Sequence, residues 1–201
     1  MREITFKIEE KQDGLMIRDF LRNFGVSSAL LTKLKRDENG ISLNGEFAKA
    51  IAVLHTSDVL KIRIKNKGKM PEKFICDKVK VAYDDEDILV LNKPPLMPVH
   101  ESRNHRGDTL ANVAACYMES DCAFRAVYRL DRDTSGLVLI AKNELAASKL
   151  AGKIKKDYYA IVKGKFEGDG TIDLPIRRVR ESIIERGVFD DGERADRKSV
   201  V

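Results

Sequence analysis

The pattern of apolar and polar positions over residues 1–64 predicts a small unit of helices and strands. Alternating apolar and polar side chains are typical of strands, and apolar residues three or four positions apart are typical of helices. In chain order the predicted elements are a strand over residues 4–8, a helix around 17–21, a helix from Ser27 or Ser28 to Arg36, a strand over 41–43, a hairpin turn at Asn44 and Gly45, and a strand over 59–64. Either serine can cap the second helix, and Asn-Gly is a strong hairpin signal.

Beyond residue 64 the pattern predicts a linker and then a larger unit. Residues 65–78 are polar, basic and interrupted by Gly and Pro, which is typical of an interdomain linker. After them we predict strands over residues 79–83, 88–92, 127–130, 136–141 and 158–162, and helices over 109–118 and 144–154. The predicted fold class is therefore α+β. A small α/β domain comes first, and a mixed, mainly antiparallel sheet with flanking helices follows.

Composition and charge permit a nucleic-acid partner without requiring one. Lys and Arg number 37 against 32 Asp and Glu, so the net charge of the 201 residues is +5. Many proteins carry a similar excess, so the charge alone identifies no partner. No apolar run approaches the roughly 20 residues that a membrane-spanning helix needs. Cys76, Cys116 and Cys122 are scattered and odd in number, which fits neither a disulfide framework nor a zinc site and favours a reducing cytoplasm.

Basic residues gather at the end of the second predicted helix. Lys33, Lys35 and Arg36 are expected along one face of this helix, with Ser28 near its start. Such a face can contact the phosphates of RNA, an interaction that sets affinity and orientation more than sequence choice. A solvated basic face explains the same residues, and the pattern alone leaves both interpretations open.

The segment from Tyr128 to Leu137, with the sequence YRLDRDTSGL, carries the candidate chemistry. It places two carboxylates, two guanidinium groups and two hydroxyls in one turn between apolar runs. Gly136 permits a positive φ or a close backbone approach. A carboxylate beside Arg stays ionised at neutral pH, so Asp131 could act as a nucleophile or a general base. A surface loop of ion pairs is the alternative that residue types and spacing leave open.

Two stretches of the chain resemble known families. Residues 15–21, 26–36, 40–45 and 57–60 follow the pattern of an S4 domain, a small α/β module that binds RNA, and the match covers about residues 14–64. S4 domains usually carry an Arg soon after the serine that opens the second helix, whereas Ala29 and Leu30 follow Ser28 here. The resemblance implies that Ser28, Lys33, Lys35 and Arg36 contact RNA.

The turn resembles the motif of RluA/RluD-type RNA pseudouridine synthases, His-Arg-Leu-Asp followed by Thr-Ser-Gly-Leu. By this resemblance Asp131 is the catalytic residue, and Arg129 helps to displace the target base from its stack. Asp133 is expected to be a structural hydrogen-bonding residue. Tyr128 stands where relatives have His, which we expect to affect the chemistry only modestly.

Two flanking segments extend this resemblance over about residues 79–195. Residues 89–100 resemble the family's Asn-Lys-Pro segment, with Leu96 where Gly is usual, and taken alone Lys93 is a solvated lysine at a strand end. Residues 156–164 resemble a Lys-x-Tyr-x-Ala-x-Val-x-Gly strand. The resemblance implies that Tyr158 lies against the target base, whereas taken alone it is a core aromatic with its hydroxyl at the surface.

The function that the resemblance implies is isomerisation of specific uridines to pseudouridine, with 23S ribosomal RNA as the expected partner. The reaction breaks the N1–C1′ bond of uridine, rotates the base and rejoins it through C5. It needs no metal, nucleotide or redox cofactor. Asp131 would attack C6 of uracil or C1′ of ribose, or remove the C2′ proton, and the sequence does not choose among these routes. We expect a cytoplasmic monomer that needs no membrane or protein partner. A non-catalytic S4-type RNA-binding protein is the alternative.

The resemblance ends near Ala195. Relatives continue with further strands and a basic segment, and this chain contains no such segment. We therefore expect the catalytic domain, residues 79–195, to be truncated at its C-terminus, with an incomplete sheet. Residues 196–201 read DRKSVV and are interpreted as a non-native tail of the kind that a sequencing-library adapter would encode. A natural truncated paralogue or a deliberately shortened chain is the alternative.

Overall fold

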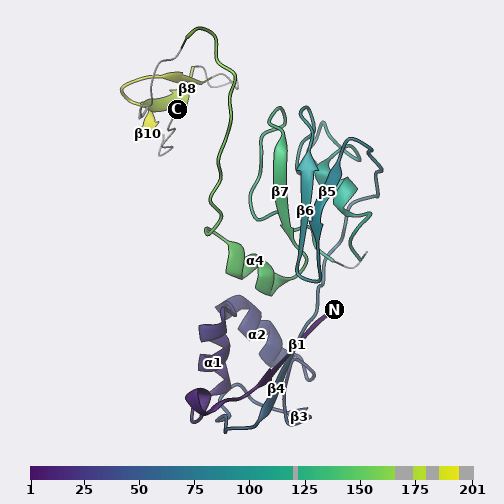
Figure 1. Cartoon of the computed structure of the whole chain (residues 1–201), viewed down its shortest axis with the longest axis vertical. Helices are drawn as coiled ribbons and strands as arrows, with labels where there is room; N and C mark the ends of the chain where they lie inside the picture. Colours follow the sequence, from purple (N-terminus) through teal and green to yellow (C-terminus); the bar gives the residue numbers. More distant parts are fainter. Residues whose placement is uncertain (120–121, 166–173, 180–185, 195–201) are drawn as a thin grey trace. The chain divides into compact units, whose positions relative to one another are not determined.

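The computed structural model describes residues 1–119, 122–165, 174–179 and 186–194 (Figure 1). It comprises two compact units, Met1–Lys155 and Lys156–Val201, and each is described by itself. The elements of the first unit are β1 (Arg2–Lys7), η1 (Glu10–Gln12), α1 (Ile17–Phe24), α2 (Ser28–Arg36), β2 (Ile41–Leu43), β3 (Glu46–Phe47), β4 (Val59–Ile64), β5 (Lys80–Asp84), β6 (Ile88–Lys93), α3 (Leu110–Ala114), β7 (Gly136–Ala141) and α4 (Glu144–Leu150). The strand pairs of the described residues are all antiparallel, which confirms the predicted α+β class with antiparallel sheets.

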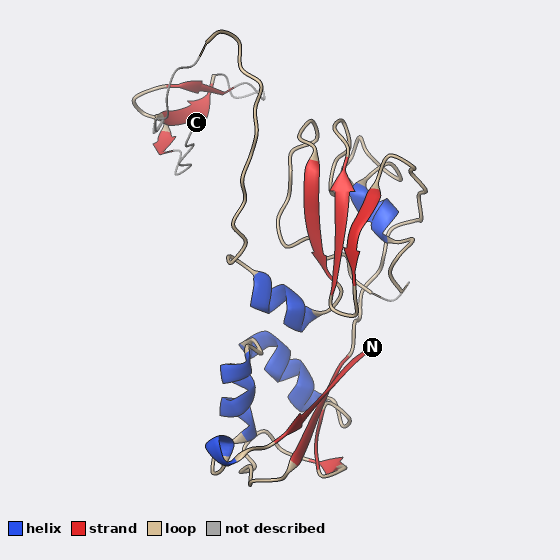
Figure 2. Ribbon diagram, in the orientation of Figure 1, coloured by secondary structure: helices blue, strands red, loops and turns tan. Residues whose placement is uncertain are grey.

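Four strands form the N-terminal sheet, in the order β1-β4-β2-β3. Figure 2 shows strands of this part of the chain in red beside its helices in blue. Strands β2 and β4 have the bounds that the alternation predicts. Asn44 and Gly45 form the turn after β2, with φ values of 53° and 91°. Both values lie in the left-handed region that a type I′ hairpin turn needs, which explains the Asn-Gly pair. Leu60 and Ile62 of β4 are fully buried in a core that includes residues of α1 and α2.

Helix α2 shows which of the two candidate serines acts as the cap. The Ser27 hydroxyl accepts a hydrogen bond of 3.2 Å from the backbone N–H of Leu30, whereas Ser28 is the first residue of the helix. This bond satisfies one of the amides that a helix start leaves without a partner. Helix α1 ends at Phe24 and is capped by Gly25, whose φ of 106° is accessible to glycine without steric penalty.

Three strands form the central sheet, in the order β5-β6-β7. The pairing of β6 with β7 runs from Ile88 opposite Ala141 to Lys93 opposite Gly136. Apolar side chains of both strands are buried together with α3 in a second core, separate from that of the N-terminal sheet. Because β7 begins at Gly136, the candidate turn lies at the end of the sheet where Lys93 ends β6.

Residues 127–130 are not a strand, so that prediction is wrong. The bonds from this stretch to β7 include one bridge, between Ala126 and Ile140, and hydrogen bonds from the Val127 N–H to the Leu139 carbonyl and from the Tyr128 hydroxyl to the Leu137 carbonyl. The chain then leaves the edge of β7 because it must reverse direction before entering that same strand at Gly136. The predicted helices over 109–118 and 144–154 are also shorter, since α3 and α4 end at Ala114 and Leu150.

Helix α4 contributes to the core of the N-terminal sheet, although it follows the central sheet in the chain. The side chain of Leu145 is 5% exposed and belongs to that core. The Ser148 hydroxyl donates to the Gly25 carbonyl at 3.0 Å, and the Lys149 ammonium lies 3.5 Å from the centre of the Phe24 ring. Helix α4 is therefore held by apolar burial, a hydrogen bond and a cation–π contact.

The predicted linker, residues 65–78, packs closely against neighbouring residues of the first unit. Met70 is buried in the core of the central sheet, and the buried Asn66 side chain donates to the Lys142 carbonyl. The backbone at Gly68 approaches Ala123 so closely that a Cβ there would lie 2.4 Å from the Ala123 Cβ. This segment therefore has fixed contacts that its polar composition did not indicate.

The second unit contains a small sheet in the order β10-β8-β9, formed by β8 (Pro175–Arg178), β9 (Arg186–Val188) and β10 (Glu193–Arg194). Residues 158–162 are not a strand, which corrects the prediction: Tyr159 and Ile161 are fully exposed. The segment does alternate, but an alternating segment becomes a strand only where a neighbouring strand completes its hydrogen bonds. No described strand does so here. The predicted tail, residues 196–201, lies outside the described residues.

The helices of the described ranges are too short or too polar to cross a bilayer. The three cysteines, all of which lie in those ranges, form no disulfide.

Candidate active site

Asp131 occupies the first position of a tight turn that lies between the buried Leu130 and the start of β7. The Thr134 N–H donates to the Asp131 carbonyl at 3.2 Å, which closes the turn over Arg132 and Asp133. Asp is favoured at this position of a β-turn. Leu130 before it is buried, and Gly136 after it begins β7 with a φ of 131°. The turn is therefore anchored on both sides, and the Asp131 side chain is exposed.

The two carboxylates of the turn differ in their partners. Asp133 accepts hydrogen bonds from the Arg132 guanidinium at 2.8 and 3.4 Å, and this bonding holds the pKa of Asp133 below its usual range. Within the described residues the carboxylate of Asp131 makes no hydrogen bond or ion pair. A carboxylate that is exposed and unpaired can approach a substrate without first breaking a contact, whereas Asp133 is already engaged.

Lys93 lies beneath this turn and is fully buried, so the interpretation of it as a solvated lysine is wrong. Its ammonium donates to the carbonyls of Pro94 at 3.0 Å, Met97 at 2.8 Å and Arg132 at 3.0 Å. Burial lowers the pKa of Lys93, and the negative charges of Asp133 and Asp131 act in the opposite direction. The sequence around Lys93 did not indicate this burial, because the Arg132 carbonyl, which accepts one of its hydrogen bonds, comes from a distant part of the chain.

Arg129 and Tyr128 come just before the turn. Partial desolvation lowers the pKa of the His100 imidazole, although the residue is exposed overall, and the positive charge of the exposed Arg129 lowers it further. The Tyr128 hydroxyl donates to the Leu137 carbonyl at 2.9 Å, which joins the segment before the turn to the strand after it. His100 and the bond made by Tyr128 were not foreseen from the sequence.

The basic residues of α2 do not all share one environment. Lys33 forms an ion pair of 2.7 Å with Glu144 of α4. Lys33 and Arg36 line a groove of about 630 Å³ to which Arg63, Lys65 and Lys67 also contribute. The Lys35 side chain is exposed but is not part of the groove lining, and Ser28 is exposed in the first turn of the helix. The groove also contains acidic groups, among them those of Asp37 and Glu38.

Tyr158 belongs to the second unit. It lies in an extended stretch without strand pairing, and its side chain is 59% exposed. The interpretation of Tyr158 as a core aromatic residue is therefore wrong.

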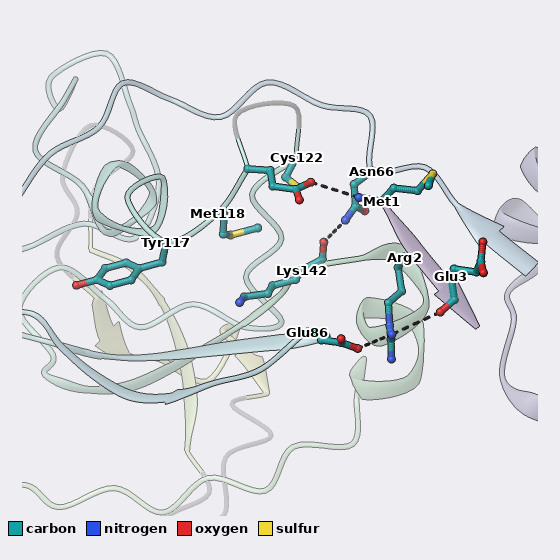
Figure 3. Close-up of a pocket in the computed structure, with 10 residues that line it drawn as sticks. Met1, Arg2, Glu3, Asn66, Glu86, Tyr117, Met118, Cys122 and Lys142 are labelled. Atoms are coloured by element: carbon teal, nitrogen blue, oxygen red, sulfur yellow. Dashed lines mark hydrogen bonds and ion pairs between the residues drawn. The ribbon is translucent and has the colours of Figure 1, made fainter. Parts of the chain in front are cut away.

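A cavity of about 550 Å³ lies away from the candidate turn, and none of its lining residues comes from the segment 128–137. Figure 3 shows the ion pair of Arg2 with Glu86 and the hydrogen bond from Asn66 to the Lys142 backbone at this cavity. The Arg2 guanidinium also donates two hydrogen bonds to the Asp87 carboxylate, at 2.9 and 3.1 Å. The paired charges at this cavity join β1 to the residues just before β6. Their contacts therefore stabilise the fold.

Comparison with known proteins gives the class of this chain. Residues 87–200 match the family described as RNA pseudouridylate synthase, and this match covers more than half of the chain. The chain therefore belongs to the RNA pseudouridylate synthase family, as its motifs predicted, and membership indicates an isomerase that acts on RNA.

Individual relatives are named for the same activity. A Bacillus subtilis protein named as the uncharacterized RNA pseudouridine synthase YjbO is 33% identical over 192 residues, a match that covers 90% of this chain and 68% of YjbO. Ribosomal large subunit pseudouridine synthase D of Pseudomonas aeruginosa is 40% identical over 124 residues, 57% of this chain and 38% of that protein. The chain thus spans about two thirds of one relative and well under half of the other.

Among solved structures, the human RNA pseudouridylate synthase domain containing 4 protein matches with a TM-score of 0.35 and 17% identity, over 59% of this chain and 48% of that one.

Proposed function

We propose that this chain isomerises specific uridines to pseudouridine in large-subunit ribosomal RNA, with Asp131 as the catalytic carboxylate. The observation that carries the proposal is the contrast within one turn: Asp133 is bonded to Arg132, whereas Asp131 is exposed and unpaired among the described residues. Membership of the family supports the reaction. The printed name of the Pseudomonas relative supports the choice of ribosomal RNA.

In the proposed reaction the N1–C1′ and C5–H bonds of uridine break and the C5–C1′ and N1–H bonds form, so no atom is gained or lost overall. Asp131 would act on C6, C1′ or the C2′ proton. The exposed guanidinium of Arg129 would displace the base from its stack, and the ring of Tyr158 would lie against the base. Flipping a base out costs a few kcal/mol, which phosphate contacts must offset.

We further propose that residues 1–64 form an S4-like RNA-binding domain, joined through residues 65–78 to a catalytic domain that begins at residue 79. Two separate apolar cores support this division. Ser28, Lys33, Lys35 and Arg36 are the proposed RNA contacts. The groove that includes Lys33 and Arg36 supports two of these four. A cytoplasmic monomer is the proposed state.

The test is to incubate the 201-residue chain and its Asp131→Ala variant with unmodified ribosomal RNA, and to map pseudouridine chemically. We expect modification by the unaltered chain, none by the Asp131→Ala variant, and similar RNA binding by both. Asp133→Asn is the matched control, because it removes a carboxylate from the same turn, and we expect it to keep most of the activity.

Equal modification by the Asp131→Ala variant and the unaltered chain would remove Asp131 from the mechanism. RNA binding without modification by any of the three proteins would instead favour a non-catalytic RNA-binding protein. Unmodified transfer RNA, added in a parallel reaction, tests the choice of substrate, since modification of transfer RNA alone would contradict the ribosomal assignment.

A further inference from the structure

The carboxylate of Asp87 accepts hydrogen bonds from two parts of the chain, and the proposed chemistry uses none of them. The Arg2 guanidinium of β1 donates at 2.9 and 3.1 Å, and the Asn143 side chain, which caps α4, donates at 2.7 Å. We propose that these bonds, the Asp87 joint, fix the N-terminal sheet to the central sheet and so select which uridine reaches Asp131. This inference rests on the proposed function.

The joint lies where elements of both sheets meet. Arg2 is in β1, an edge strand of the N-terminal sheet, and pairs there with Ile64 of β4. Asp87 directly precedes β6, the middle strand of the central sheet. The Lys142 N–H, just after β7, donates to the Asp87 carbonyl at 2.9 Å. One residue therefore connects β1 with the start of β6 and the end of β7.

Asn143 gives the joint a second connection to the N-terminal sheet. Its side chain is 1% exposed, and both of its polar atoms are engaged. The carbonyl oxygen accepts from the Ala146 N–H at 2.9 Å and caps α4, while the amide nitrogen donates to Asp87. Because α4 places Leu145 in the core of the N-terminal sheet, the orientation of this helix is tied to Asp87. Loss of the Asp87 carboxylate would leave a buried amide without its acceptor.

The residue that follows Asn143 adds a contact of the same kind. Glu144 accepts from Lys33 of α2 at 2.7 Å and lies 3.5 Å from the Arg125 guanidinium, which precedes β7. Lys33 also lines the groove proposed to contact RNA. The start of α4 therefore holds together the proposed RNA-binding helix and residues next to the central sheet.

The candidate turn lies at the opposite end of the strands that carry the joint. The pairing of β6 with β7 begins with Ile88 opposite Ala141, next to the joint, and ends with Lys93 opposite Gly136, next to the turn. The six residues of β6 span roughly 17 Å at about 3.4 Å per step. Over that length a rotation of about 10° at the joint moves the turn by about 3 Å.

A movement of this size matters for the choice of substrate. A displacement of about 1 Å in a reacting group can lower the rate roughly 100-fold. With RNA held by the N-terminal domain, a rigid joint lets only a uridine at one distance from the bound phosphates reach Asp131. Without the joint the turn can reach uridines at several distances. We therefore expect a loss of selectivity that is larger than the loss of overall activity.

The experiment compares the full chain with the variants Asp87→Ala and Arg2→Met. Asp87→Ala removes the acceptor of both connections, whereas Arg2→Met removes only the donor from β1. The matched controls are Asp77→Ala, which removes an exposed carboxylate just before β5, and Lys7→Met, which removes an exposed cation from β1. Circular dichroism first establishes that each variant is folded.

Two readouts follow, and the first needs no activity. Residual dipolar couplings of backbone amides are measured for the N-terminal sheet and the central sheet, and a single alignment tensor fits both sheets if they are rigidly joined. The second readout uses fragments of unmodified ribosomal RNA around a uridine that the unaltered chain modifies. Pseudouridine formation is compared between the natural fragment and fragments with one or two base pairs inserted in the adjoining stem.

For the unaltered chain and both controls we expect a single tensor, and a rate at least about 10-fold higher on the natural fragment than on the inserted ones. For Asp87→Ala and Arg2→Met we expect different tensors for the two sheets and a rate ratio at least about threefold lower, with Asp87→Ala the more affected. If Asp87→Ala does not fold, Arg2→Met decides by the same two readouts.

Separate tensors in the unaltered chain, or a single tensor in both joint variants, would overturn the proposed joint. Different tensors with an unchanged rate ratio would overturn its role in substrate choice, as would an equal fall in the ratio in the controls. A folded unaltered chain that modifies no RNA would count against the proposed function, and the alignment tensors would still decide whether Asp87 joins the two sheets.

Discussion

Replacing Leu145 by Ala is the most direct perturbation of the contact between α4 and the N-terminal sheet. Leu145 is 5% exposed and lies in a core otherwise built from residues 8–64. Burial of this kind makes a Leu→Ala change cost about 2–5 kcal/mol, through lost transfer free energy and the cavity that remains. Because the bond from Ser148 and the contact of Lys149 with Phe24 remain, we expect a value of about 2–3 kcal/mol.

The assay is urea unfolding followed by far-ultraviolet circular dichroism and tyrosine emission, because the chain contains no tryptophan. A loss of about 2–3 kcal/mol is a large part of the 5–15 kcal/mol typical of a domain, so the midpoint should move clearly. Leu137→Ala is the matched control. Its side chain is 53% exposed on β7, so we expect a change below about 0.5 kcal/mol. Equal effects of the two substitutions would refute the placement of Leu145 in that core.

Three further predictions follow from individual contacts. Ser27→Ala should lower the free energy of unfolding by about 1 kcal/mol and Ser28→Ala by less than about 0.5 kcal/mol in urea titrations, and the reverse order would contradict the assigned cap. Asn112→Ala should cost about 2–3 kcal/mol by thermal unfolding, because this buried side chain bonds both Thr109 and the Glu72 carbonyl; a change below 0.5 kcal/mol would contradict that network. Hydrogen bonds from the Asn44 side chain and the His55 N–H lower the pKa of Asp58, so the stability it contributes is present above about pH 5 and is lost as the pH falls through that lowered pKa. The difference in melting temperature between the unaltered chain and Asp58→Asn should therefore shrink from pH 6 to about pH 2, and a constant difference would refute this cause.

The parts of the fold that could be predicted are those whose pattern is local. Alternation in β2 and β4 fixed both bounds, since each strand has one buried and one more exposed face. The turn at Asn44 and Gly45 was predictable because few residue pairs adopt two successive positive φ values. The strand prediction for residues 158–162 failed because alternation carries no information about whether a neighbouring strand is present. Residues 127–130 do have a neighbour in β7, but the chain turns away from it to reverse direction before Gly136.

The same distinction applies to the candidate site. The motif around Asp131 is contiguous, so it could be found by reading along the chain, and the roles of Asp131, Arg129 and Tyr158 stay predictions. The burial of Lys93 depends on the Arg132 carbonyl, 39 residues further on, and no local pattern indicates it. For the same reason the pairing of Lys33 with Glu144, 111 residues away, could not be foreseen from a basic helix face.

The place of Leu145 in the chain also has a consequence for synthesis. The rest of its core is complete once Ile64 has been made, and Leu145 follows roughly 80 residues later. At 5–20 residues per second, this interval lasts roughly 4–16 s. During that time the growing polypeptide carries an apolar patch that its own later helix will cover. Chaperones that bind nascent chains would therefore meet this patch before α4 emerges.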